Sequence, residues 1–254
     1  MRYVGIDLAW GTRARTGLAI LDDAGRLVAS TSVRTDDEIV EFLGDAAKGP
    51  GLVVAIDAPL IVPNETGQRP CEREVNAHFH RFHAGAYPSN RGMKPFNPTP
   101  RGATLAQRCG WAMDPAIAAG SMRAIAIEVY PHPAMVSLFG LTQVLKYKRG
   151  RGRSVAGRRA ELLRAMAGMD EAFGSLMDLA RSERWSYLRA QVDGATRPVD
   201  LNRVEDEIDA VLCAYLAWMW ANRRAELTVH GDALAGFIVT PVPPRQNETT
   251  QQQP

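Results

Sequence analysis

The chain has 254 residues, with 30 Lys and Arg against 28 Asp and Glu, so its net charge of +2 demands no polyanionic partner. Its 46% hydrophobic and 23% charged residues exclude a disordered or fibrous protein. Cys71, Cys109 and Cys213 are widely spaced and form no CxxC pair, which argues against disulfides and structural zinc. The longest apolar stretch, VLCAYLAWMWA, is too short to span a bilayer. The sequence therefore predicts a cytoplasmic protein that does not enter the membrane.

The first sixty residues predict a mixed α/β sheet. Tyr3–Leu8, Gly17–Leu21 and Leu27–Val33 are expected to be strands that follow one another through turns. Asp36–Ala47 has the apolar spacing of a short helix and ends at a Gly-Pro pair. Leu52–Ile56 is a continuous apolar run, which is typical of a strand that is covered on both faces.

The middle of the chain has weak periodicity. Residues 63–121 are rich in Pro, Gly, Asn and Arg, and they predict an insertion with at most a short helix at Glu72–Phe82. A further strand, Ile125–Tyr130, is expected to end in a turn at Pro131-His132-Pro133. Long segments with weak periodicity, such as residues 63–121, commonly lie over active sites.

The C-terminal part is predicted to be mainly helical. Residues 146–188 are expected to form helices interrupted by glycines, and Val204–Arg224 has the clearest helical spacing in the chain. Gly236–Val242 is a candidate edge strand. We expect one domain over residues 1–242 and a disordered polar tail over residues 243–254.

Acidic residues stand at or near the ends of three predicted strands. Asp7 follows YVGI, Asp57 follows VVAI, and Glu128 lies within IAIEVYP. Asp206 and Asp209 lie three residues apart and share one face of the last helix. A single such Asp often caps a turn, and DEID can be a solvated helix face, so the structural interpretation stays open for each acid.

The combination of acids indicates a more specific chemistry. Carboxylates that converge repel one another, and a hard divalent cation with oxygen ligands relieves that repulsion. Paired ions of this type activate water and stabilise the leaving oxygen in phosphodiester hydrolysis. The pattern therefore predicts a Mg²⁺ or Mn²⁺ site and metal-dependent hydrolysis of nucleic acid.

Five segments carry a family resemblance. GIDLAWG, AIDAPL, CERE, EVYPHPA and DEIDAVLCAYLA together resemble the domain-of-unknown-function 429 family, predicted nucleases of RNase H-like fold, over residues 1–242. DEIDA also resembles the D-x-x-D-A helix of Holliday-junction resolvases, a distant branch of that fold. The resemblance implies a mixed sheet in which Asp7, Asp57 and Asp209 bind divalent metal, with Asp206 next and Glu128 fitting less directly.

Two histidine groups are weighed as catalytic or metal-binding residues. His132, between two prolines just after Glu128, is a candidate general acid or base, and it is equally interpreted as a turn residue. His78, His80 and His83 resemble a metal tract, but their spacings of two and three do not place them on one helix face.

Two groups of basic residues are candidates for substrate binding. Arg69, Arg73 and Arg91 are placed to clamp a phosphate or carboxylate, or else to pair internally with Glu72. The run KYKRGRGRSVAGRR favours a flexible loop that follows a phosphate backbone, or else a solvated linker. Its candidate contacts are Lys148, Arg151 and Arg153.

Two other functions compete with a nuclease. GIDLAWGTRARTGLAIL also resembles the first hairpin of actin-like kinases, which bind metal–ATP, although the pattern is not repeated as two similar lobes would require. A non-catalytic RNase H-like binding module is the third hypothesis. The sequence leaves the oligomeric state and the choice between DNA and RNA open.

Overall fold

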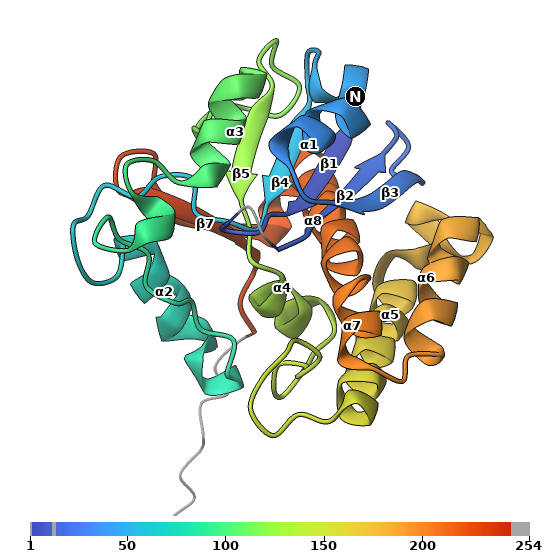
Figure 1. The fold of residues 1–254 in the computed structure, drawn as a ribbon. Coiled ribbons are helices and arrows are strands. Elements are labelled where there is room, and N and C mark those ends of the chain that lie inside the picture. Colours follow the sequence, from blue (N-terminus) through green and yellow to red (C-terminus); the bar gives the residue numbers. More distant parts are fainter. Residues whose placement is uncertain (1, 12–13, 245–254) are drawn as a thin grey trace, which may run out of the picture.

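The computed structural model describes residues 2–11 and 14–244. Its centre is a five-stranded sheet in the order β3-β2-β1-β4-β5 (Figure 1). The strands are β1 (Tyr3–Asp7), β2 (Thr16–Leu21), β3 (Leu27–Val33), β4 (Val53–Ile56) and β5 (Ile125–Glu128). β1, β4 and β5 are parallel, while β2 is antiparallel to both β1 and β3. This mixed sheet, flanked by helices, confirms the predicted α/β class and is consistent with an RNase H-like fold.

Helices cover both faces of the sheet. One face packs against α1 (Asp36–Leu43) and α3 (Arg101–Cys109), and Val4 and Ile6 point to that side. The other face packs against α8 (Glu205–Asn222), with Tyr3 in the same hydrophobic cluster. The two faces alternate along β1 because successive side chains of a strand point to opposite sides.

Two glycines bring α8 close to the sheet. An ideal Cβ on Gly5 would lie 2.0 Å from the carbonyl oxygen of Ala210, and one on Gly17 would lie 1.8 Å from that of Asp206. Real Cβ atoms do not approach backbone so closely, so only glycine permits this packing. The first turn of α8 therefore rests directly on β2.

A helical layer lies outside α8. It contains α4 (Pro131–Leu138), α5 (Val155–Met177), α6 (Glu183–Asp193) and α7 (Pro198–Asn202). The prediction of glycine-interrupted helices from residue 146 is wrong for α5, which runs unbroken through three glycines. One of them, Gly168, packs under the Phe139 ring, where a Cβ would lie 2.7 Å from a ring carbon.

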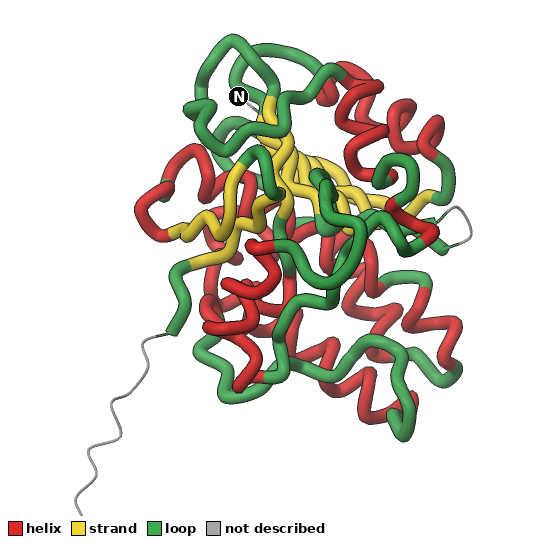
Figure 2. The backbone as a smooth tube through the Cα atoms, turned by 90° about the vertical axis from the view of Figure 1, so that its left-hand side faces the viewer, coloured by secondary structure: helices red, strands yellow, loops and turns green. Residues whose placement is uncertain are grey.

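A second, two-stranded sheet lies beside α2 (Figures 1 and 2). β6 (Leu227–Asp232) and β7 (Gly236–Pro241) are antiparallel, and β7 agrees with the strand predicted at residues 236–242. The predicted tail lies outside the described residues from residue 245 onward.

The insertion contains more helix than predicted. It includes α2 (Pro70–Phe79) and α3. The other elements of the described chain, inside and outside the insertion, are short 3-10 turns at Gly44–Ala47, His80–Phe82, Lys94–Phe96, Leu179–Arg181 and Arg224–Glu226. The turn expected at Pro131-His132-Pro133 is wrong, because Pro131 begins α4. Proline is well tolerated in the first helical turn, where backbone N–H groups have no intrahelical acceptor.

Candidate functional site

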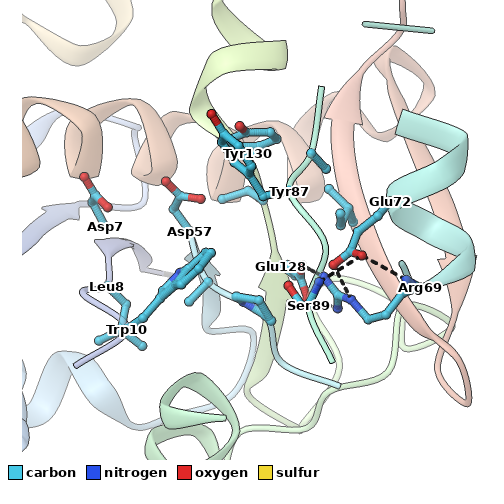
Figure 3. A pocket seen from close by; sticks show the side chains of 15 residues that line it. Asp7, Leu8, Trp10, Asp57, Arg69, Glu72, Tyr87, Ser89, Glu128 and Tyr130 are labelled. Atoms are coloured by element: carbon cyan, nitrogen blue, oxygen red, sulfur yellow. Dashed lines mark hydrogen bonds and ion pairs between the residues drawn. The ribbon is translucent and has the colours of Figure 1, made fainter. Parts of the chain in front are cut away.

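Asp7 and Asp57 lie side by side at one end of the sheet. β1 and β4 are parallel neighbours in register from Tyr3 and Val53 to Ile6 and Ile56, and Asp7 and Asp57 follow the last pair. The backbone N–H of Asp57 donates to the carbonyl of Ile6 at 2.8 Å, which fixes this alignment. Figure 3 shows the two carboxylates next to each other.

The last helix adds two more carboxylates to the same place. Asp206 and Asp209 lie in the first two turns of α8, which Gly17 holds against β2. Asp209 is fully buried. Asp7, Asp206 and Asp209 converge on one atom, the Nζ of Lys148, at 3.0, 3.2 and 2.6 Å respectively. We call these three residues together with Asp57 the acidic cluster.

Lys148 reaches the acidic cluster from the loop between α4 and α5. The adjacent Tyr147 is buried, and its hydroxyl donates to Asp209 Oδ1 at 2.8 Å. Arg158 Nε donates to the carbonyl of Tyr147 at 2.7 Å, and its Nη2 bonds Glu205 Oε2 at 2.8 Å. These contacts fasten the loop to the start of α8, so the ammonium group is held in the cluster by the chain around it.

Burial and mutual repulsion set the protonation of the cluster. Burial raises the pKa of Asp7 to about 6, with Lys148 acting in the opposite direction and Asp209 adding to the rise. Burial and the nearby Asp7 raise the pKa of Asp206 to about 6. Burial lowers the pKa of Lys148, but Asp209, Asp7 and Asp206 outweigh it, so the pKa stays well above its usual value and the lysine is charged.

Asp57 differs from the other three. Its carboxylate makes no hydrogen bond or ion pair with any other residue of 2–11 and 14–244, although it lies in the same field. Burial raises its pKa well above the usual value, and the charges of Asp7 and Asp209 add to that rise. A half-buried carboxyl that has a raised pKa and no partner in the described chain is typical of functional sites.

The side chains of the acidic cluster are of the type that binds a divalent cation, but Lys148 occupies their centre in this structure. Its donors are carboxylate oxygens, and one lysine leaves an excess of negative charge, as Mg²⁺ or Mn²⁺ sites require. Among the described residues, however, no three His, Cys, Asp or Glu side chains are arranged to hold a metal. Lys148 Nζ takes the place where three carboxylates meet, so a cation bound by all three would have to displace it.

Glu128 is engaged elsewhere. Arg69 Nη1 and Nη2 donate to Glu128 Oε2 and Oε1 at 2.9 and 2.6 Å, and Arg69 Nε donates to Glu72 Oε1 at 2.8 Å. All three side chains are buried. The structure thus matches the alternative of internal Arg–Glu pairing, and the donors of Arg69 are used within the protein.

A cavity of about 160 Å³ opens beside the acidic cluster. Asp7 and Asp57 line it on one side, the Arg69–Glu72–Glu128 group on another (Figure 3). Trp10 and Tyr87 also line it, and the sequence did not single them out because nothing in their local pattern distinguishes a site aromatic from a core one.

The remaining predicted residues lie outside the cavity. The His132 ring packs 5.9 Å from the Tyr147 ring, and burial, with Lys148 and Arg153, lowers the pKa of His132 to about 3, so it is neutral. Arg73 and Arg91 are exposed and contact the Gln68 carbonyl and Glu65. Arg151 and Arg153 are exposed on the Lys148 loop, where Arg153 donates to the Lys148 carbonyl.

The histidines of the insertion do not come together as a metal tract. His78 lies on α2, 5.7 Å from the ring of His230, whereas His80 starts the following 3-10 turn and His83 ends it in the left-handed conformation. Within the described part of the chain, they belong to no group able to bind a metal.

The chain belongs to the family described as protein of unknown function (DUF429), whose model matches residues 5–251. The match includes all four aspartates of the acidic cluster and the lysine among them. Neither the curated proteins nor the solved structures give a match. None of the helices within residues 2–11 and 14–244 has both the length and the apolar character needed to span a bilayer.

Proposed function

We propose that this protein is a divalent-metal-dependent phosphodiesterase that hydrolyses nucleic acid. The observation that carries the proposal is the convergence of four aspartates, from β1, the end of β4 and α8, beside an open cavity. Structural carboxylates are normally paired one to one with cations, whereas here one lysine faces three, and Asp57 has no ion-pair partner among the described residues.

The residues of the acidic cluster would hold the cation. Asp7, Asp57 and Asp209 are the proposed ligands, with Asp206 next to them. When bound, Mg²⁺ or Mn²⁺ would supply Lewis acidity toward a phosphoryl oxygen and neutralise charge that develops in hydrolysis.

Lys148 holds the cluster together before the cation binds. Its positive charge offsets the repulsion of Asp7, Asp206 and Asp209, and its side chain is 28% exposed, so a path to solvent exists. Once displaced, the ammonium group lies on a loop with exposed Arg149, Arg151 and Arg153. A loop of this charge suits contact with the phosphate backbone of the substrate.

A nuclease assay tests the proposal. Single-stranded and duplex DNA and RNA are incubated with Mn²⁺ and wild-type protein, Asp7→Asn or Asp57→Asn, and products are resolved on denaturing gels. We expect each substitution to lower the rate at least about a hundredfold, because a metal ligand is lost.

Asp45→Asn is the matched control, since Asp45 lies in the 3-10 turn after α1 and outside the cavity. It should cleave like the wild type. Equal residual activity in all variants would assign the activity to a contaminant or to another site, and would overturn the proposal.

The competing functions make different predictions. An actin-like phosphotransferase needs a second similar lobe, and the described residues hold one five-stranded and one two-stranded sheet. A non-catalytic module would bind nucleic acid without hydrolysing it in the presence of any metal ion.

The free thiols of Cys71, Cys109 and Cys213 are compatible with the proposed cytoplasmic, reducing location.

A further inference from the structure

Two solvent-exposed aromatic side chains lie at the cavity beside the acidic cluster. Trp10 is 41% exposed and follows Asp7 by three residues, and Tyr87 is 76% exposed in the loop after α2. In the view of Figure 3, Asp57 lies between Trp10 and Tyr87. Exposed aromatic surface is unfavourable in water, so two such rings at one cavity indicate a ligand contact surface.

The two rings are placed to stack on a flat group. Trp10 packs edge-on against buried Phe96, with ring centroids 5.0 Å apart and planes at 62°, which orients the indole and leaves much of it uncovered. Tyr87 makes no hydrogen bond with another described residue. Aromatic rings presented in this way stack on nucleobases of any sequence.

The inner wall of the cavity is acidic. The oxygens of Glu72 and Glu128 are occupied by Arg69 and by backbone N–H groups of Leu60, Arg69 and Ser89. Asp57 is left with no hydrogen bond within the described chain. Arg69 is matched by the two glutamates, so this part of the wall has no positive charge left to attract a phosphate and suits an uncharged base.

The size of the cavity limits what enters. Its volume of about 160 Å³ is smaller than the ~300 Å³ at which pockets for drug-sized ligands begin. That space suits one planar ring and excludes a base pair. The phosphates attached to that ring would lie outside the cavity.

We propose that this cavity is a subsite for one unpaired nucleobase, stacked by Trp10 and Tyr87, and that the substrate is therefore single-stranded nucleic acid. The inference rests on the proposed function for its ligand class. It adds which form of nucleic acid is bound and which residues select it.

Binding without turnover tests the subsite. Fluorescence anisotropy in EDTA, where no metal-dependent hydrolysis occurs, compares a labelled single-stranded oligonucleotide with its duplex, using the full chain. We expect the single strand to bind at least about tenfold more tightly. Trp10→Ala and Tyr87→Ala should each weaken single-strand binding by about tenfold or more, because one stacking partner is lost.

Conservative and control variants separate stacking from folding. Trp10→Phe and Tyr87→Phe keep an aromatic face and should bind within about threefold of wild type. Tyr187→Ala removes an exposed tyrosine of α6 outside the cavity and should bind like wild type. Binding should also quench tryptophan emission in the wild type and quench it less in Trp10→Phe. Tyr87 is so exposed that its truncation tests the subsite even if Trp10→Ala unfolds.

The inference would be overturned by equal affinity for duplex and single strand, by wild-type affinity of Tyr87→Ala, or by no binding of either nucleic acid. A nucleoside monophosphate that binds as tightly as the oligonucleotide would assign the cavity to free nucleotides instead. Single-strand binding that depends on the aromatics, without cleavage in Mn²⁺, refutes the phosphodiesterase alone. Cleavage of duplex that is unaffected by Tyr87→Ala refutes the subsite alone.

Discussion

The Nζ of Lys148 lies 2.6 Å from Asp209 Oδ2 and joins a loop lysine to an aspartate buried in the last helix. The same ammonium also contacts Asp7 and Asp206. A single positive charge thus holds three carboxylates from two elements that the chain must bring together. Replacing Lys148 therefore tests how stable the acidic cluster is with and without a bound cation.

Lys148→Met should destabilise the metal-free protein and strengthen metal binding. The substitution leaves the carboxylates without their counter-charge, which lowers the free energy of unfolding by about 3 kcal/mol, the low end for breaking a buried pair because Lys148 is partly exposed. Mn²⁺ should restore the loss and shift the melting temperature more than in the wild type.

The measurement is urea denaturation in EDTA and in Mn²⁺, with Arg151→Met as the control for loss of an exposed positive charge on the same loop. If Lys148→Met were as stable as Arg151→Met and gained nothing from Mn²⁺, the lysine would not occupy a cation site.

Asp57→Asn should stabilise the metal-free protein while abolishing activity. The Asp57 carboxylate is unpaired within the described residues and lies beside Asp7, so a neutral isostere removes repulsion. We expect an increase of about 1 kcal/mol in the free energy of unfolding at neutral pH. Thermal melts in EDTA, beside the nuclease assay, check both halves. A destabilised Asp57→Asn would mean that the carboxylate is structural.

Arg69→Met should destabilise the protein by about 3–5 kcal/mol, because Glu128 and Glu72 would be left buried and uncompensated. Arg69→Lys should not rescue it, since an ammonium does not reproduce the two-pronged contact with Glu128. Urea denaturation measures the change, and Arg73→Met, at an exposed site, should cost less than about 0.5 kcal/mol. A stable Arg69→Met with weakened nucleic-acid binding would favour the sequence-based assignment of Arg69 to the substrate.

Gly17→Ala should disturb the acidic cluster by displacing the start of α8. A Cβ at residue 17 would lie 1.8 Å from the Asp206 carbonyl oxygen, so the first turn of α8 has to move away from β2. Overpacking of backbone against backbone costs about 3 kcal/mol, and the displaced Asp206 and Asp209 should lose metal binding. Melts and Mn²⁺ titration test this. Gly174→Ala, on α5 with no contact closer than 3.7 Å, is the control.

The parts of the site that depend on local pattern could be predicted from the sequence. Apolar runs that end in Asp7 and Asp57 predict two strands with an acid at their ends, and the spacing of α8 places Asp209 on its packing face. Each of these patterns involves only a few consecutive residues, so predicting it does not require knowing which other parts of the chain pack nearby.

The parts that depend on tertiary partners could not be predicted. Lys148 stands in a run of exposed basic residues, and only the anchoring of Tyr147 and Arg158 to α8 turns it toward the cluster. Glu128 closes a strand as Asp57 does, yet Arg69 from the insertion neutralises it. The difference between a proposed metal ligand and a structural acid lies in a contact that sequence spacing does not encode.

His230 should make the stability of the protein depend on pH. The ring is buried in β6, its Nε2 lies 2.9 Å from Thr240 Oγ1, and Glu74 Oε2 is 4.0 Å from Nδ1. Burial, with His78 nearby, lowers the pKa of His230 from 6.5 to about 4. The unfolded chain therefore takes up a proton at higher pH than the folded one. The stability that neutral His230 contributes is complete above pH 6.5 and falls as the pH drops toward 4, by about 3 kcal/mol at most.

Asp7 and Asp206 act in the opposite direction over part of this range, so the informative quantity is the difference between the free energies of unfolding of wild type and His230→Gln, measured by urea denaturation at successive pH values. That difference should shrink between pH 6.5 and 4, and parallel curves would show that the histidine titrates alike in the folded and unfolded states.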